Sequence, residues 1–197
     1  MTPSGPPLLW VIAGPNGAGK TTCYEEVVRP RLQAEFVNAD RIAASLWPDD
    51  AGRHAYEAAA LAAKRRTELV EKRVSFVTET VFSHSSKLDL MRNARDAGYQ
   101  IWLTVVCLEN AELAVRRVAD RVASGGHDVP EQKIRERYER ITDNVRVGVG
   151  PADRALVLDN SDPTRPLRSI LTFHGGTLVY RARPLPRWCL RMFAPLL

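Results

Sequence analysis

A glycine-rich segment near the start of the chain constrains its fold more than any other feature. Residues 14–21 read GPNGAGKT and match the pattern G-x-x-x-x-G-K-[ST] in full. The segment follows an apolar run, LLWVIA at residues 8–13, and precedes a helical pattern that runs from Gly19 toward Arg31. Strand, glycine-rich loop and helix in this order form the phosphate-binding unit of P-loop proteins. The sequence therefore predicts a nucleoside triphosphate site at the first turn of an α/β fold.

Each part of this loop predicts a contact with the nucleotide. Glycines let the loop curl so that backbone N–H groups point at phosphate oxygens, and the helix that follows adds its positive N-terminal end. We expect Lys20 to reach the β- and γ-phosphates of ATP, and the Thr21 hydroxyl to ligate Mg²⁺. The expected nucleotide-binding residues are Gly14, Pro15, Asn16, Gly17, Ala18, Gly19, Lys20, Thr21 and Thr22.

The rest of the chain alternates between strand and helix patterns. Further apolar runs occupy residues 35–38, 75–79, 101–108 and 155–160, and helical patterns lie at residues 51–72, 85–97, 111–123 and 130–145. This alternation predicts right-handed βαβ units in a doubly wound, mostly parallel sheet of about five strands. Residues 169–182 predict a C-terminal β-hairpin that turns at Gly175–Gly176. We expect a single domain over residues 1–197, with the tail either packed back on it or bound to a partner.

Two large classes of P-loop protein fit the sequence poorly. Transporter-type ATPases carry an LSGGQ-like signature, then four apolar residues and Asp-Glu; here the run ALVLDN ends in Asp159 and Asn160, and no signature precedes it. GTPases carry an N-K-x-D motif, which is absent from the sequence. The next class to consider is the kinases, which need acidic residues and arginines beside the phosphate loop.

Two acidic residues follow the next two predicted strands. Asp40 lies in EFVNADRIA and Glu79 in SFVTETVFS. Ligands of doubly wound sheets bind beyond the carboxyl ends of the strands, so both carboxylates are expected beside the phosphate loop. Asp40 could instead cap a helix that begins at Arg41, and Glu79 could be paired with a nearby base.

An arginine-rich helical pair follows, at residues 114–140 approximately. Its first helix carries Arg116, Arg117 and Arg121, and its second, after the turn SGGHDVP, carries Arg135, Arg137 and Arg140. Arginines stabilise the charge that spreads over a phosphoryl group during transfer, so this pair predicts a lid over the triphosphate. The alternative is a solvated arginine-rich hairpin.

Taken together, these motifs resemble the zeta toxin family of P-loop kinases. The segments GPNGAGKTT, FVNADRIA, FVTETVFS, GGHDVPEQKIRERYER and LVLDNS occur in this order and span nearly the whole chain. The resemblance implies a kinase that uses ATP and Mg²⁺ to phosphorylate the 3′-hydroxyl of a UDP-activated amino sugar, typically UDP-N-acetylglucosamine. It also implies a small antitoxin protein that neutralises the enzyme.

The resemblance further implies roles for individual residues. Asp40 matches the catalytic base of the family, and Glu79 matches an acid near the substrate. Arg117 matches the first lid arginine, which touches the transferring phosphate. The second lid arginine falls at about His127 here, so that contact is either lost or supplied by Arg121.

The segment TVFS, residues 80–83, departs from the toxin branch, which has a small residue, Thr and an Arg there to hold the sugar nucleotide. Thr80 and Ser83 are nevertheless expected to bind the substrate together with Asp40 and Glu79. Two other functions therefore stay open. The chain could phosphorylate another small hydroxylated metabolite or drug, in a way similar to chloramphenicol phosphotransferase, or it could be a nucleotide-dependent interaction module without phosphotransfer.

The composition narrows the expected partners and compartment. A net charge of +5 favours anionic partners, and phosphorylated small molecules explain it without nucleic acid, because most positive charges lie in helical patterns interleaved with acids. The basic stretch Lys64–Arg66 could bind a diphosphate or lie at the surface. Three distant cysteines without a CxxC pair favour a reducing, cytoplasmic setting, and no apolar run is long enough to cross a membrane.

Overall fold

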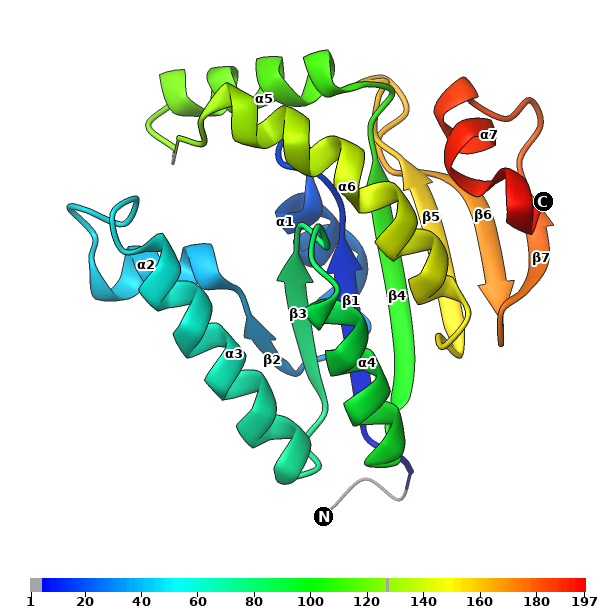
Figure 1. Cartoon of the computed structure of the whole chain (residues 1–197), viewed down its shortest axis with the longest axis horizontal. Coiled ribbons are helices and arrows are strands. Elements are labelled where there is room, and N and C mark those ends of the chain that lie inside the picture. The colour runs from blue at the N-terminus through cyan, green and yellow to red at the C-terminus, as the bar shows by residue number, and fades with distance from the viewer. Residues whose placement is uncertain (1–4, 127) are drawn as a thin grey trace.

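A computed structural model describes residues 5–126 and 128–197. Its centre is a seven-stranded sheet in the order β2-β3-β1-β4-β5-β6-β7 (Figure 1). The strands are β1 (Leu8–Ala13), β2 (Glu35–Val37), β3 (Phe76–Thr80), β4 (Gln100–Cys107), β5 (Arg154–Asp159), β6 (Arg168–His174) and β7 (Thr177–Arg181). The first five strands are parallel, which confirms the predicted doubly wound sheet. The predicted hairpin, β6 and β7, extends the same sheet because β6 pairs antiparallel with β5.

Helices connect the strands in the predicted alternation. They are α1 (Lys20–Cys23), α2 (Ala39–Leu46), α3 (Ala55–Glu71), α4 (Ser86–Asp96), α5 (Ala111–Ala123), α6 (Glu131–Val149) and α7 (Arg187–Phe193), with a π-helical segment η1 (Tyr24–Val28) after α1 and a 3₁₀ turn η2 (Ala194–Leu196) at the end. The pattern predicted at residues 19–31 thus begins as an α-helix and widens into a π-helix, where the Arg29 N–H bonds to the Tyr24 carbonyl. Helix α3 starts at Ala55 rather than at residue 51, because Pro48 and a series of turns precede it.

The two faces of the sheet are covered by different helices. Alternation along β1 places Leu9 and Val11 in one apolar cluster, with residues of α3, α4 and α7, and places Trp10 and Ile12 in the other, with residues of α1, η1 and α5. Figure 1 shows α3, α4 and α6 in front of the sheet and α1 behind it. All of β1 except its first residue is buried, as the apolar run LLWVIA predicts.

Helix α6 contributes to both clusters. Ile134 and Tyr138, in its first half, pack with α5 and η1, whereas Ile141 and Val145, further along, pack with α4 and the strands of the other face. The Tyr138 hydroxyl also donates a hydrogen bond to the Leu108 carbonyl over 2.8 Å. Helix α6 is therefore fixed to the body of the fold along most of its length.

The C-terminal tail packs back on the sheet, which was one of its two expected states. Helix α7 begins after Pro186, and the side chains of Trp188 and Phe193 are buried in the cluster that also contains Ile141. The helix was not predicted from the sequence, since prolines and arginines interrupt its apolar pattern.

Candidate active site

The glycine-rich loop, residues 14–19, is packed so closely that a side chain would clash at each of its three glycines, and a Cβ atom on Gly17 would lie 2.8 Å from the carbonyl oxygen of Ala114 on α5. A Cβ atom on Gly19, whose φ is +87°, would lie 2.4 Å from Nδ2 of Asn160. A Cβ atom on Gly14 would lie 2.3 Å from the carbonyl oxygen of Val106 on β4. The motif glycines are therefore required by contacts with the ends of β4 and β5 as well as by the curl of the loop.

Asn160, which follows β5, makes a hydrogen bond to the phosphate loop. Its Nδ2 donates a hydrogen bond of 2.8 Å to the Ala18 carbonyl, and its Oδ1 accepts one of 3.1 Å from the Leu167 N–H. In the sequence, Asn160 was notable only because transporter-type ATPases have a glutamate at this position after the apolar run. The structure shows that Asn160 joins the phosphate loop to the segment after β5.

Lys20 lies inside the loop and faces an acid. Its Nζ donates a hydrogen bond of 3.0 Å to the Pro15 carbonyl and lies 3.8 Å from Oε1 of Glu79. The two side chains are only 8% and 9% exposed. Burial lowers the pKa of Lys20, and the nearby carboxylates of Glu79 and Asp40 oppose that shift. The ammonium group is thus held where a triphosphate in the loop would need it.

Glu79 also organises the ends of β2 and α1. Its Oε2 accepts hydrogen bonds from the Thr21 hydroxyl, over 3.0 Å, and from Nδ2 of Asn38, over 2.9 Å. The Oδ1 of Asn38 accepts a hydrogen bond from the Arg41 N–H, so Asn38 is the N-cap of α2. The alternative in which Asp40 caps this helix is wrong, because Asp40 already lies within its first turn.

One pocket, with a volume of about 410 Å³, collects most of the predicted site residues. It lies at the carboxyl ends of the strands, beside the phosphate loop, as expected for a doubly wound sheet. The predicted residues that line it are Asn16, Gly17, Lys20, Thr21, Asp40, Glu79, Thr80, Ser83 and Arg121. Asp40 has no hydrogen-bond or ion-pair partner among the described residues, so its carboxylate is available to a ligand.

The turn after β3 positions Thr80 and Ser83 through a strained residue. Phe82 is fully buried and has a φ of +64°, which is unusual for a bulky side chain. Its N–H donates to Oγ1 of Thr80 over 3.2 Å, and its carbonyl accepts from Nδ2 of Asn144 over 3.1 Å. These bonds and the burial of the ring hold the turn in a conformation that turns Thr80 and Ser83 to the pocket.

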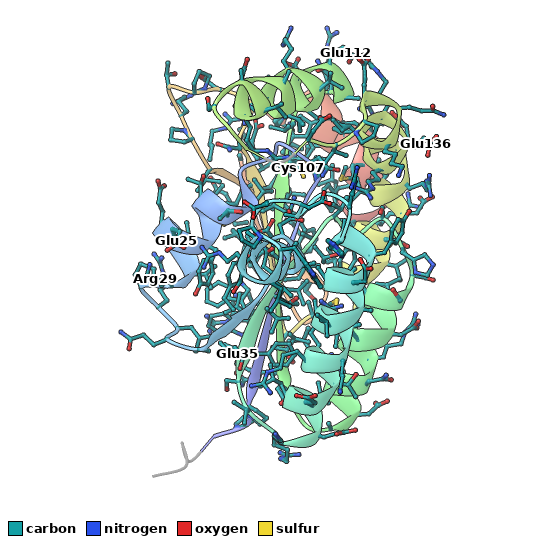
Figure 2. All side chains as sticks on the ribbon, turned by 90° about the vertical axis from the view of Figure 1, so that its left-hand side faces the viewer. Glu25, Arg29, Glu35, Cys107, Glu112 and Glu136 are labelled. Carbon is teal, nitrogen blue, oxygen red and sulfur yellow. The ribbon has the colours of Figure 1, made fainter. Side chains whose placement is uncertain are left out.

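Four arginines of α5 and α6 lie in two different environments. Arg121 and Arg137 line the pocket, and Nη1 of Arg137 is 3.5 Å from Oδ1 of Asn16 in the loop. Arg135 and Arg140 instead pair with acids on the outer surface: Arg135 with Glu112, and Arg140 with Glu136. Figure 2 labels Glu112 and Glu136 at the periphery of these two helices.

Arg117, the first lid arginine of the resemblance, is placed differently from Arg121. It is not among the described residues that line the pocket, and its Nη2 donates to the Ser161 carbonyl over 3.4 Å. A Cβ atom built on Gly17 would lie 3.2 Å from the Cβ of Arg117, so the stem of Arg117 lies beside the loop. His127, the position of the second lid arginine, lies outside the described residues.

The oxygen atoms at the end of the loop fit a magnesium ion. The Thr21 hydroxyl and the Glu79 carboxylate are hard oxygen donors 3.0 Å apart, and Mg²⁺ prefers such donors while keeping waters and phosphate oxygens as its other ligands. Among the described residues, no group of three or more His, Cys, Asp or Glu side chains is arranged to hold a metal ion. The site therefore fits a nucleotide-bound Mg²⁺ rather than a metal held by the protein alone.

A second hollow, of about 670 Å³, lies on the surface beside η1. Glu25, Arg29 and Glu35 line it and are labelled in Figure 2. It contains none of the predicted site residues, and Glu25 and Arg29 pair with each other there. The chemistry predicted from the motifs belongs to the first pocket.

Comparison with known families classifies the chain. A family model described as "AAA domain" (AAA_33) matches residues 9–144, from β1 into α6. The chain belongs to this AAA domain family. The match covers the phosphate loop, Asp40 of α2, Glu79 of β3, all of α5 and most of α6 in this AAA domain. A relative in Haemophilus influenzae is 28% identical over 144 residues, which cover 66% of this chain and 96% of the relative, and it is described as an uncharacterized protein.

Solved structures share the fold of this AAA domain at low sequence identity. The AvrRxo1-ORF1:-ORF2 complex with ATP gives a TM-score of 0.75 at 14% identity, covering 98% of this chain and 65% of that chain. The PezAT toxin–antitoxin system of Streptococcus pneumoniae gives 0.62 at 14% identity, covering 87% and 73%. A putative kinase from Chloroflexus aurantiacus gives 0.55 at 17% identity, covering 68% and 78%. These similarities establish a P-loop kinase-like fold.

In the described part of the chain, no helix is long and apolar enough to span a membrane.

Proposed function

We propose that this chain is an ATP- and Mg²⁺-dependent small-molecule kinase of the zeta-toxin type. One observation carries the proposal: the pocket that holds Lys20 and Thr21 of the phosphate loop also holds the carboxylate of Asp40, which has no hydrogen-bond or ion-pair partner among the described residues, and three arginines, Arg66, Arg121 and Arg137. A module that only binds nucleotide has no need of such a carboxylate. An enzyme that activates a hydroxyl does need one, beside the γ-phosphate.

The proposed reaction follows from the positions of these groups. The acceptor hydroxyl donates its proton to Asp40, its oxygen attacks the γ-phosphorus of ATP, and ADP leaves. Lys20, Arg121 and Arg137 stabilise the charge on the transferring group, and Arg117 is proposed to assist through the loop or the nucleotide. Thr21 and Glu79 would hold the magnesium ion, which neutralises phosphate charge when bound. Catalysis is then mostly positioning and electrostatics.

The proposed acceptor is a UDP-activated amino sugar such as UDP-N-acetylglucosamine, bound near Glu79, Thr80 and Ser83. The zeta-toxin motifs support this choice, and the similarity to the PezAT toxin–antitoxin system supports a small antitoxin as partner. A cytoplasmic setting is proposed from the cysteine pattern, and the three cysteines are buried and form no disulfide with one another.

The test is to measure ADP release and product formation with Mg²⁺·ATP, with and without UDP-N-acetylglucosamine. We expect ADP release that depends on the sugar nucleotide and a phosphorylated product detected by mass spectrometry. Transfer to another metabolite or drug, without transfer to any UDP-sugar, would favour the other kinase function. Binding of ATP without transfer to any acceptor would favour the interaction module.

A further inference from the structure

Arg66 on α3 is a buried cation that no described residue pairs with. It is 8% exposed and lines the pocket, yet it makes no hydrogen bond or ion pair with any described residue. Burial lowers the pKa of Arg66. Its nitrogen atoms are not fully buried and reach the pocket, so an anionic ligand there would pair with a charge that no described residue neutralises.

The neighbouring basic residues do not share this position. Lys64 is exposed and does not line the pocket. Arg65 pairs with both carboxylate oxygens of Glu35, each over 2.7 Å, and with Glu68 over 2.9 Å. Of the basic stretch Lys64–Arg66, only Arg66 points into the pocket, because the rotation of α3 against the sheet turns that position inward.

Lys87 at the start of α4 adds a second cation to the same wall. It is half-buried, lines the pocket and has no side-chain partner among the described residues. The pKa of Lys87 is lowered by burial and, to a smaller extent, by the positive charge of Arg66, so the two cations lie close enough to repel each other. No acid of α3 or α4 lines the pocket in the described structure; the acids there, Asp40, Glu79 and Asp128, come from other segments.

The face of α3 that leads to Arg66 leaves room for a ligand. Ala55, Ala59 and Ala62 line the pocket along one side of the helix, with Arg66 one turn further on. Eleven residues of helix separate Ala55 from Arg66, which corresponds to roughly 16 Å. The short side chains of these alanines leave space in the pocket along the side of the helix that carries Arg66.

We propose that Arg66 and Lys87 form a subsite for an anionic group of the acceptor, a phosphate or a carboxylate remote from the hydroxyl that is phosphorylated. This inference rests on the proposed kinase function and narrows its substrate class. Acceptors that carry such a group are bound, and neutral alcohols, sugars and drugs are rejected because they leave both cations unpaired. In a nucleotide sugar, the diphosphate is the group that fits.

Binding gives the first test, because it does not require turnover. With the phosphate loop saturated by Mg²⁺·ADP, titration calorimetry should detect UDP-N-acetylglucosamine or inorganic pyrophosphate, and should detect no binding of N-acetylglucosamine. Arg66→Met and Lys87→Met should each weaken binding of the anionic probe by roughly 10- to 100-fold, the range for a lost hydrogen bond to a charged group. The matched control, Lys64→Met, removes a cation from the same helix outside the pocket and should bind as wild type does.

Stability and kinetics give independent readouts. Arg66→Met should melt at or above the temperature of wild type, since it removes an unpaired buried charge, whereas loss of a structural arginine would lower that temperature. With a turned-over anionic acceptor, KM should rise by the same factor while kcat changes little. Gluconate, N-acetylglucosamine 1-phosphate and UDP-N-acetylglucosamine in the acceptor panel distinguish carboxylate, phosphate and diphosphate.

The failure of this inference differs from the failure of the kinase function. Equal binding of the anionic probes by wild type and both variants, no binding by wild type, or transfer to a neutral acceptor would overturn the subsite. Absence of transfer to every acceptor would instead overturn the kinase function, while the binding experiment would still decide whether the subsite exists.

Discussion

The Thr21 hydroxyl donates a hydrogen bond of 3.0 Å to the Glu79 carboxylate, and this contact joins the phosphate loop to the end of β3. The same carboxylate lies 3.8 Å from Nζ of Lys20. One acid thus contacts both loop side chains that the proposed mechanism assigns to phosphate and magnesium. Its removal should affect both.

We expect Glu79→Gln to change how activity depends on pH. Lys20 must be protonated to stabilise phosphate charge, so kcat/KM should fall as pH rises through the pKa of Lys20, which burial lowers from its usual 10.5. The charge of Glu79 raises that pKa, so Glu79→Gln should move the alkaline limb of the profile to lower pH. A pH–rate profile of both proteins measures this, and an unchanged alkaline limb would contradict the assigned pairing.

Lys20→Ala should leave a folded protein that has lost most of its activity. The loop lies at the end of the sheet, and the lysine is buried as a charge, so circular dichroism should show a melting temperature near that of wild type or above it. ATP affinity or turnover should fall by roughly 10²-fold or more, because the group that neutralises the β- and γ-phosphates is missing. Turnover equal to that of wild type would reject the proposed role of the loop.

Asp40→Asn removes the proposed catalytic base but should leave the fold intact. Asn38→Ala, its matched control, removes the cap of α2 and should lower stability. The amide cannot accept the proton of the substrate hydroxyl, so phosphoryl transfer should fall by at least about 10²-fold while ATP binding and melting stay native-like. Asn38→Ala removes the true cap of α2 and a bond to Glu79, and should cost about 1 kcal/mol in free energy of unfolding. Near-normal transfer by Asp40→Asn would make Glu79 the next acid to test.

Kinetic measurements on alanine variants should distinguish the arginines that contact the transferring phosphate from those that do not. Alanine at Arg121 or Arg137 should lower turnover by roughly 10³-fold or more with a much smaller loss in ATP affinity, as for arginines that stabilise phosphoryl transfer. The zeta-toxin resemblance predicts the same for Arg117→Ala. Equal losses of ATP affinity and rate would instead make Arg117 a ground-state ligand, consistent with its contact to the Ser161 carbonyl. Arg140→Ala, which removes an arginine paired on the outer surface, is the control and should be close to silent.

The strands and the loop were predictable because local sequence determines them. A parallel strand that is buried on both faces must be apolar throughout. The run LLWVIA meets this requirement and therefore predicts a buried strand. The loop glycines and Lys20 carry their conformation and chemistry in a short motif.

Residues whose role depends on tertiary packing were not predictable in this way. Asn38 and Asp40 are both good caps, and only the backbone at the end of β2 decides between them. Three adjacent basic residues look alike in sequence, and only the rotation of α3 singles out Arg66. Arg137 likewise shares its helix with Arg135 and Arg140, which face acids. The tail helix α7 was missed because its few apolar residues gain their stability from the sheet they cover.

Because helix α6 is built into both apolar clusters, the nucleotide site cannot open by swinging that helix away. Exposing Ile134 and Tyr138 alone would cost several kcal/mol at about 1.5–3 kcal/mol per large apolar side chain, and the Tyr138 bond to Leu108 would be lost as well. Arg137, one residue before Tyr138, is therefore set in place before ATP arrives. At the proposed site of phosphoryl transfer, the fold therefore holds a preorganised charge on a helix that stays in place.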